Sequence, residues 1–152
     1  MTFLNVKEYI PHEDPMVVID RIVDMGSDFV ECEVEIREDS FLCENGKVPS
    51  YLGMEFIAQS IAAFSGKMGK DLGESKPGIG FLIGIRRYRS SRESFNVGEV
   101  LKVRAEMVFI EESLGNFKAS ISVSGEDVVS TSISTFKPSE EQFSKMKESW
   151  NV

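Results

Sequence analysis

One stretch decides the fold: residues 49–72, PSYLGMEFIAQSIAAFSGKMGKDL. It begins with a proline and a serine, and its apolar residues then recur on nearly every side of the helix that this spacing predicts. A helix that is apolar almost all round is typical of a protein interior rather than a surface. Lys67 and Lys70 occupy the last turns and Gly73 follows, as expected at the carboxyl end of a helix. The stretch therefore predicts one long, buried helix.

Segments on both sides of this helix alternate apolar with polar residues, the period-two pattern of strands with one face in water. Tight connections are predicted at residues 26–28, 113–116 and 125–127. Pro138 is predicted to end the sheet before a polar tail with a weak helix around Phe143 and Met146. One buried helix wrapped by a single antiparallel sheet of about six strands is an α+β architecture. The strands are expected at residues 16–24, 30–36, 81–88, 101–109, 117–123 and 128–136.

The length and composition fit one globular domain. The chain has 152 residues, 41% of them apolar and 28% charged, and we expect a domain over residues 1–152 with its core at about 10–137 and a polar tail at 138–152. The net charge of −8 argues against a nucleic acid partner. The first residues lack the features of a signal peptide, and no apolar run reaches the ~18 residues of a membrane span. Cys32, Cys43 and the single histidine form neither a disulfide framework nor a metal site, so we expect a cytoplasmic protein without metal or cofactor.

Polar residues interrupt the apolar helix near its start. Glu55 lies one turn into it, and Gln59 follows four residues later on the same face. An ionised carboxylate costs several kcal/mol to bury unless it is paired. Glu55 therefore either complements the positive end of the helix dipole or serves a reaction, and its apolar neighbours favour the reaction. The amide groups around Ser50 either cap the helix or are free to hold an oxyanion.

Two further features have both a functional and an ordinary interpretation. His12 is the only histidine, and thus the only side chain whose ordinary pKa lies near neutrality. A general base of that kind must be this residue; otherwise it is a turn histidine between two prolines. Four arginines fall within seven residues of an acidic chain, and they either dock an acidic protein or alternate along a solvated strand. They are Arg86, Arg87, Arg89 and Arg92.

Three motifs, in this order, resemble the 3-hydroxyacyl-acyl carrier protein dehydratases of fatty-acid synthesis. The first is IPHEDPM at residues 10–16, followed by an apolar run into Asp20 and Arg21. The second is PSYLGMEFIAQ at residues 49–59, which resembles the central helix of that family. The third is FLIGI at residues 81–85, with basic residues and then VGE after it. The likeness covers most of the chain and implies a hotdog fold. More closely, the chain resembles a divergent branch associated with polyketide-like acyl chains, including aryl polyene pathways.

The resemblance implies the elimination of water from a 3-hydroxyacyl thioester, held on the phosphopantetheine of an acyl carrier protein, to give the trans-2-enoyl thioester. In that mechanism a histidine removes the C2 proton, and the carboxyl group at the Glu55 position protonates or orients the departing hydroxyl. Amide groups at the helix start hold the thioester oxygen. The likeness places Ser50, Gly53 and Gln59 at the substrate. It also implies a homodimer, or a higher even oligomer, with the substrate tunnel at the interface.

One departure from the family concerns the base. The usual histidine stands in a Gly-His-Phe-Pro-Gly segment shortly before the helix, whereas residues 40–47 of this chain, SFLCENGK, contain none. Three hypotheses follow. In the first, His12 replaces the missing base and works with Glu55. In the second, the chain is a hotdog thioesterase in which Glu55 activates water. In the third, it is a non-catalytic subunit that binds acyl chains or partners an active dehydratase.

Overall fold

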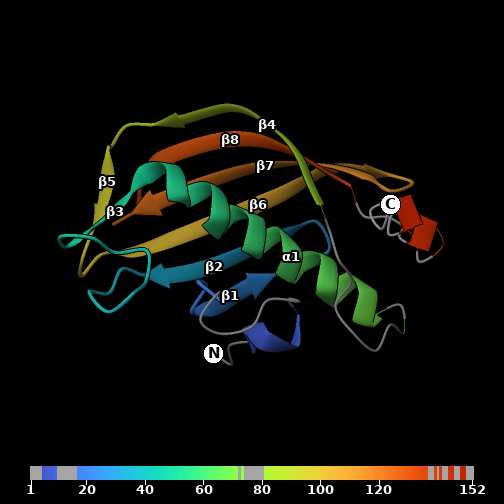
Figure 1. Cartoon of the computed structure of the whole chain (residues 1–152), viewed down its shortest axis with the longest axis horizontal. Helices are drawn as coiled ribbons and strands as arrows, with labels where there is room; N and C mark the ends of the chain where they lie inside the picture. The colour runs from blue at the N-terminus through green and yellow to red at the C-terminus, as the bar shows by residue number, and fades with distance from the viewer. Residues whose placement is uncertain are drawn as a thin grey trace.

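Helix α1 spans Gly53–Asp71 and is the long helix that the sequence predicts (Figure 1). A 3-10 turn, η2, precedes it at Ser50–Leu52. The side chains of Phe56, Ile57 and Phe64 are almost fully buried, and each stabilises the fold by ~1.5–3 kcal/mol because its apolar surface leaves water. The computed structural model places the helix against the concave face of a curved sheet, and it describes residues 5–9, 17–71, 73, 81–136, 139, 141, 144, 145, 148 and 149.

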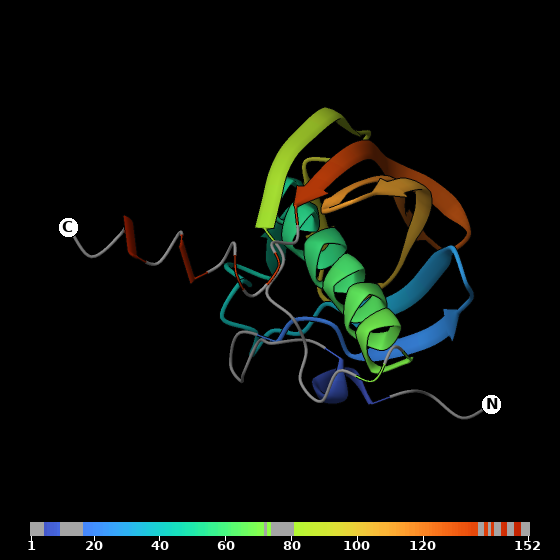
Figure 2. The same ribbon diagram turned by 90° about the vertical axis from the view of Figure 1, so that its right-hand side faces the viewer.

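Six antiparallel strands form this sheet in the order β1-β2-β6-β7-β8-β4, and they wrap around the helix (Figures 1 and 2). Strand β4 follows the helix in sequence but pairs with the last strand, β8, at the edge opposite β1. A separate pair joins β3, Lys47–Pro49, to β5, Ser94–Asn96. The predicted α+β architecture is confirmed. The six strands are β1 Arg21–Met25, β2 Phe29–Glu35, β4 Phe81–Ser90, β6 Val100–Glu111, β7 Leu114–Val123 and β8 Glu126–Phe136.

The predicted alternation of residues 30–36 is confirmed by burial. Val30, Cys32 and Val34 of β2 are buried opposite buried residues of β6, whereas the glutamates between them are partly exposed. A slip of one residue in this register would bury the glutamates, so the pattern fixes the pairing. Farther along the sheet, the ring of Phe117 in β7 meets the ring of a helix phenylalanine, Phe64, edge to face with 5.8 Å between centroids.

The first predicted strand is correct in kind but begins later than expected. Strand β1 starts at Arg21, whereas the Val and Ile residues predict a strand from residue 16. In the structure the N–H of Val18 donates to the side-chain oxygen of Gln59 in α1, 2.9 Å away. Val18 is therefore bound to the helix, whereas Asp20, two residues later, already donates its N–H to the Glu33 carbonyl of β2.

The two turns predicted after the helix overlap their expected ranges, and each begins one residue earlier than expected. They are at residues 112–113 and 124–125, where Glu112 and Ser124 adopt positive φ angles of 54° and 51°. Ser113 and Gly125 lie in these turns as predicted, whereas the other residues of the expected ranges belong to the starts of β7 and β8. The remaining predictions for the tail concern Pro138, Phe143 and Met146, which lie outside the described residues.

A short 3-10 helix, η1 at Val6–Glu8, and the residue after it pack on the carboxyl half of α1. The side chain of Tyr9 is buried, and Lys70 of α1 lies 4.9 Å from the centroid of its ring. The backbone carbonyl of Tyr9 presses against Gly66, where a methyl group would collide with it. This contact explains a glycine in the middle of a helix, a position where glycine is normally unfavourable.

We predict that Gly66→Ala destabilises the protein by ~1–3 kcal/mol, because the added methyl group overpacks the contact with Tyr9. In an uncrowded helix the same change stabilises by ~1 kcal/mol, so the sign of the effect tests the contact. The measurement is the free energy of unfolding from a urea titration. Gly84→Ala is the control, since a methyl group there meets no atom within 4 Å. A Gly66→Ala protein as stable as the wild type would contradict the docking of Tyr9 on the helix.

Candidate functional site

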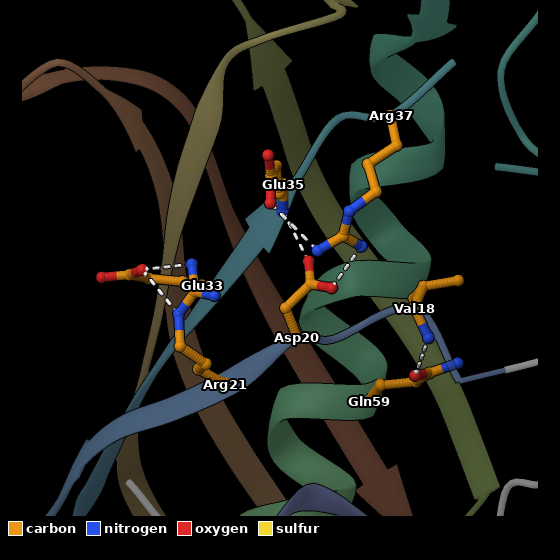
Figure 3. Close-up of polar contacts among 7 residues, drawn as sticks. All are labelled: Val18, Asp20, Arg21, Glu33, Glu35, Arg37 and Gln59. Carbon is orange, nitrogen blue, oxygen red and sulfur yellow. Dashed lines mark hydrogen bonds and ion pairs between the residues drawn. The ribbon is translucent and has the colours of Figure 1, made fainter. Parts of the chain in front are cut away.

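Glu55 and Gln59 are joined in one hydrogen-bonded chain on α1. Gln59 Nε2 donates to Glu55 Oε1 over 2.9 Å. Gln59 Oε1 accepts the N–H of Val18, also over 2.9 Å (Figure 3). Gln59 is fully buried, with 0% exposure, whereas Glu55 is half-buried. The predicted location of the two side chains on one helix face is confirmed, and their hydrogen bond orients the carboxyl group of Glu55.

The backbone of Ser50 forms hydrogen bonds that connect the start of the helix with β4 and with the segment between β4 and β5. The hydroxyl of Tyr88, in β4, donates to the Ser50 carbonyl over 2.6 Å, and the Ser50 N–H donates to the Glu93 carbonyl over 2.9 Å. The Ser50 side chain makes no capping hydrogen bond, because Pro49 occupies the cap position. Ser50 is therefore not the N-cap that its residue type suggests, and its N–H is not free to hold an oxyanion.

The next two amide groups of the helix start belong to Tyr51 and Leu52. They lie in the 3-10 turn η2 at the amino end of the helix, where backbone N–H groups lack the i−4 carbonyls of a continuous α-helix. Gly53 follows, and a methyl group on it would collide with the Tyr88 hydroxyl and with Ile121 of β7. The glycine thus has a packing role, since it lets β4 approach the helix start closely.

Strand β4 directs basic side chains outward and Tyr88 toward the helix. Its pairing with β8 shifts register between Arg86 and Arg89, and Arg87 adopts a positive φ of 52°, so the strand contains a bulge. All three arginines are exposed, and none of them forms an ion pair within the described part of the chain. The sequence around these arginines did not predict that Tyr88 points toward the helix. The bulge in β4 accounts for this orientation.

Arg92, the fourth arginine of the sequence cluster, is engaged elsewhere. Its guanidinium group binds both carboxylate oxygens of Glu99, at 2.8 and 2.6 Å. The hydrogen bond from Arg92 lowers the pKa of Glu99, so the pair contributes stability that is present above pH ~4.5 and is lost as the pH falls. Arg92 is thus paired with an acid, unlike the three arginines of β4.

A second polar cluster fastens the segment before β1 to the end of β2. Asp20 accepts the N–H of Glu35 through Oδ2 and the guanidinium of Arg37 through Oδ1, each over 2.6 Å (Figure 3). Arg37 also binds the Glu35 carboxylate over 3.0 Å, and its hydrogen bond with Asp20 raises the pKa of Arg37. Beside them Arg21 binds Glu33 over 2.8 Å. Asp20 and Arg21, which belong to a motif of the family resemblance, therefore hold the first two strands together.

The segment without the family histidine, residues 40–47, is a series of turns. The N–H of Cys43 donates to the Ser40 carbonyl, and Asn45 and Gly46 turn the chain with positive φ before β3. Leu42 of this segment lines a pocket at the start of α1. The segment therefore forms a wall at the place in the sequence where the family has its base.

His12 lies outside the described residues, so its meeting with Glu55 stays a prediction. The described residues on each side of it contact α1: Tyr9 packs on Gly66, and Val18 binds Gln59. The described residues that flank His12 in the sequence therefore contact the helix that carries Glu55.

The described residues include neither a metal-binding cluster nor a membrane-spanning helix. No group of three or more His, Cys, Asp or Glu residues among them is placed to hold a metal ion. No helix in that part of the chain is long and apolar enough to cross a membrane. The expectation that the protein uses no metal stays a prediction for the whole chain.

Comparisons with known proteins point to one family. A family model described as ApeP-like, ApeP dehydratase, matches residues 4–148. The chain is 28% identical over 132 residues to the 3-hydroxyacyl-acyl-carrier-protein dehydratase FabZ of Acinetobacter baylyi, which covers 82% of this chain and 86% of that protein. It also resembles a solved structure, the dehydratase heterocomplex ApeI:P from Xenorhabdus doucetiae. That match has a TM-score of 0.88 and 29% identity, and it covers 95% of this chain and 98% of that chain.

A more distant solved structure shows the fold alone. It is a hypothetical thioesterase protein with coenzyme A from Streptococcus pneumoniae, with a TM-score of 0.60 and 14% identity over 77% of this chain and 84% of that chain. Together with the heterocomplex, it confirms the predicted hotdog fold. At this identity it does not favour the thioesterase hypothesis.

We predict that the Tyr88 phenol ionises with a midpoint near pH 12, because burial at the helix start raises its pKa to about 12. Subtracting the phenolate absorbance titration of Tyr88→Phe from that of the wild type isolates this residue among the three tyrosines. The lost hydrogen bond should cost ~0.5–1.5 kcal/mol of unfolding free energy at neutral pH. Because the folded pKa is the higher one, this advantage declines as the pH rises from about 10 to about 12. A difference midpoint near 10 would contradict the buried contact.

Proposed function

The chain belongs to the ApeP-like dehydratase family, and we propose that it eliminates water from a 3-hydroxyacyl thioester on an acyl carrier protein to give the trans-2-enoyl thioester. The names of the FabZ relatives support this substrate class. The observation that carries the proposal is the half-buried carboxyl group of Glu55, held at the helix start by the buried amide of Gln59. The proposal includes a cytoplasmic location and acyl chains of the polyketide type.

Elimination requires a base at C2, an acid at the C3 hydroxyl and donors at the thioester oxygen. The base takes the C2 proton, and the electron pair of that bond becomes the C2–C3 double bond as the C3–O bond breaks. Glu55 in its protonated form gives the proton with which the hydroxyl leaves as water. The amide groups of Tyr51 and Leu52 hold the negative charge that the thioester oxygen gains, since the Ser50 N–H is bonded to Glu93. Gln59 positions the carboxyl group.

The proposed base is His12, whose ordinary pKa near neutrality suits the removal of the C2 proton. The contacts of its neighbours support the assignment. Tyr9 packs on the carboxyl half of α1, and Val18 binds Gln59, which in turn binds Glu55. Both of these contacts are made with the helix that carries Glu55, and this supports the choice of His12.

Two observations favour a second candidate role, that of a subunit in a mixed dehydratase. The similar solved structure is described as a dehydratase heterocomplex, and residues 40–47 of this chain contain no histidine. In this role the chain contributes Glu55 and the helix start, and a second hotdog subunit contributes the base.

Association with a second chain, identical or not, is supported by surfaces that one chain leaves open. Met54, Ala58 and Ala62 form an apolar face of α1 that is only half-buried in the single chain. Strand β4 is an edge of the six-stranded sheet, with its outer hydrogen-bonding groups toward no other strand of that sheet. Sheet edges and apolar faces of this kind are commonly covered by association. We propose a homodimer for the His12 mechanism and a heterocomplex for the second role.

We predict that Glu55→Gln and His12→Ala each lower the rate of dehydration by ~10²–10⁴-fold, the usual contribution of a general acid or base. The measurement is the loss of water from a 3-hydroxyacyl carrier protein, followed by mass spectrometry. Glu106→Gln, an exposed carboxyl group on β6, is the matched control and should keep full activity. The fold and association state of each variant are checked by circular dichroism and light scattering.

The outcomes separate the hypotheses. Full activity of His12→Ala, with Glu55→Gln inactive, would exclude His12 as the base. A chain that is inactive alone but active when mixed with a histidine-bearing hotdog subunit would establish the mixed dehydratase. Release of the free acyl acid, instead of water, would overturn dehydration in favour of the thioesterase.

The exposed arginines of β4 are proposed to dock the acidic carrier protein. In a chain with a net charge of −8, a local basic surface is the feature that can steer an acidic partner.

We predict that reversing Arg86 and Arg89 to Glu weakens carrier-protein binding about tenfold at low salt and less at high salt, with kcat unchanged. The measurement is titration calorimetry at two salt concentrations. Lys102→Glu, exposed on β6, is the control, and equal effects of the two changes would show a general charge effect rather than docking.

A further inference from the structure

The peptide unit between Ser50 and Tyr51 is hydrogen-bonded at one end and open at the other. Its carbonyl, that of Ser50, accepts the Tyr88 hydroxyl over 2.6 Å and also the N–H of Gly53 at the end of η2. Its N–H, that of Tyr51, forms no hydrogen bond within the described part of the chain. Because Tyr51 is also exposed, this N–H is available to a ligand.

The bond at the carbonyl acts on the N–H because the two groups belong to one rigid plane. A trans peptide unit is planar, and its C=O and N–H point in opposite directions. The Tyr88 hydroxyl therefore fixes the direction of the Tyr51 N–H without touching it. Hydrogen bonds in a chain also polarise one another, by ~10–30% per bond, so a bonded carbonyl makes its N–H a stronger donor. The preceding N–H, that of Ser50, is anchored as well, by the Glu93 carbonyl.

The hydroxyl of Tyr88 is held in place and keeps its proton. Gly53 leaves the space in which the hydroxyl lies, since a methyl group there would collide with it and with Ile121 of β7. Burial raises the pKa of Tyr88 to about 12, so at neutral pH the side chain is a phenol that donates a hydrogen bond. Its proton is committed to the Ser50 carbonyl, and the tyrosine is therefore not itself a general acid.

We propose that Tyr88 is a positioning residue for the oxyanion donor: its hydroxyl, through the Ser50 carbonyl, directs and strengthens the Tyr51 N–H that receives the charge of the thioester oxygen. The inference rests on the proposed function, because that reaction places negative charge on this oxygen. The charge grows as the C2 proton leaves, so the tyrosine stabilises the transition state much more than the bound substrate.

The NMR signal of a bound carbonyl carbon tests the proposal without requiring turnover. The probe is a saturated acyl pantetheine amide with ¹³C at its acyl carbonyl, which has no 3-hydroxyl group to lose and no thioester to hydrolyse. Hydrogen bonds to the oxygen move the carbonyl resonance downfield, so the signal should shift downfield when the probe binds to the full-length protein. Tyr88→Phe should move it part of the way back, with the dissociation constant changed less than about twofold.

Tyr9→Phe is the matched control, because it removes the hydroxyl group of another buried tyrosine, one that packs on the carboxyl half of the same helix. This variant should leave the signal where the wild type has it, and circular dichroism verifies the fold of both variants. In turnover, Tyr88→Phe should lower kcat by ~3–10-fold with KM nearly unchanged. The expected loss is smaller than the ~10²–10³-fold that follows outright removal of an oxyanion donor, because the N–H itself remains.

The outcomes separate the role of Tyr88 from the reaction itself. A wild-type signal without a downfield shift, or a shift that Tyr88→Phe leaves unchanged or that both variants change equally, would overturn the positioning role even if dehydration is observed. A Tyr88→Phe protein with a higher KM and the wild-type kcat would overturn it too, because the tyrosine would then serve binding alone. The expected change of the signal without any loss of water from a 3-hydroxyacyl carrier protein would support the positioning of the amide and contradict the proposed reaction.

Discussion

A helix start leaves backbone polar groups without partners inside the helix, and other parts of the protein or water must satisfy them. The start of α1 meets this requirement with partners from three separate segments. Ser50 uses the Tyr88 hydroxyl in β4 and the Glu93 carbonyl before β5, and Gln59 uses the backbone of Val18 before β1. The same hydrogen bonds that complete the helix therefore position the walls of the site. They also orient the Gln59 amide, which donates to Glu55 at the position where the family resemblance expects an acid.

Strand β4 connects the surface of the molecule with this helix start. Its bulge at Arg87 places basic side chains outside and Tyr88 inside, so the strand contacts solvent and Ser50 within three residues. Gly53 permits the close approach, since a methyl group there would displace the tyrosine hydroxyl. A partner that binds the outer side of β4 would thus touch the element that holds the proposed oxyanion donors. The geometry favours docking and chemistry on the two sides of one strand.

Charge is distributed unevenly over a chain that is acidic as a whole. The arginines of β4 form no ion pair among the described residues, whereas Arg37 and Arg92 are bound to carboxylates. An acidic carrier protein would therefore be attracted to the outer side of β4.

The residue periodicity by itself determined the buried helix, the alternation of β2 and the antiparallel sheet, because burial of one face follows local spacing. The proximity of Glu55 and Gln59 could also be predicted, because residues four apart in a helix lie on the same face. Only the tertiary structure decided what Ser50 binds, that Tyr88 turns inward, and that Val18 leaves the first strand for the helix. From residue type alone, Ser50 was expected to cap the helix, Tyr88 to belong to a surface strand, and Val18 to lie within a longer first strand. Tyr88 and Ser50 are 38 residues apart and Val18 and Gln59 are 41 apart, so these bonds form only once the sheet has curved around the helix.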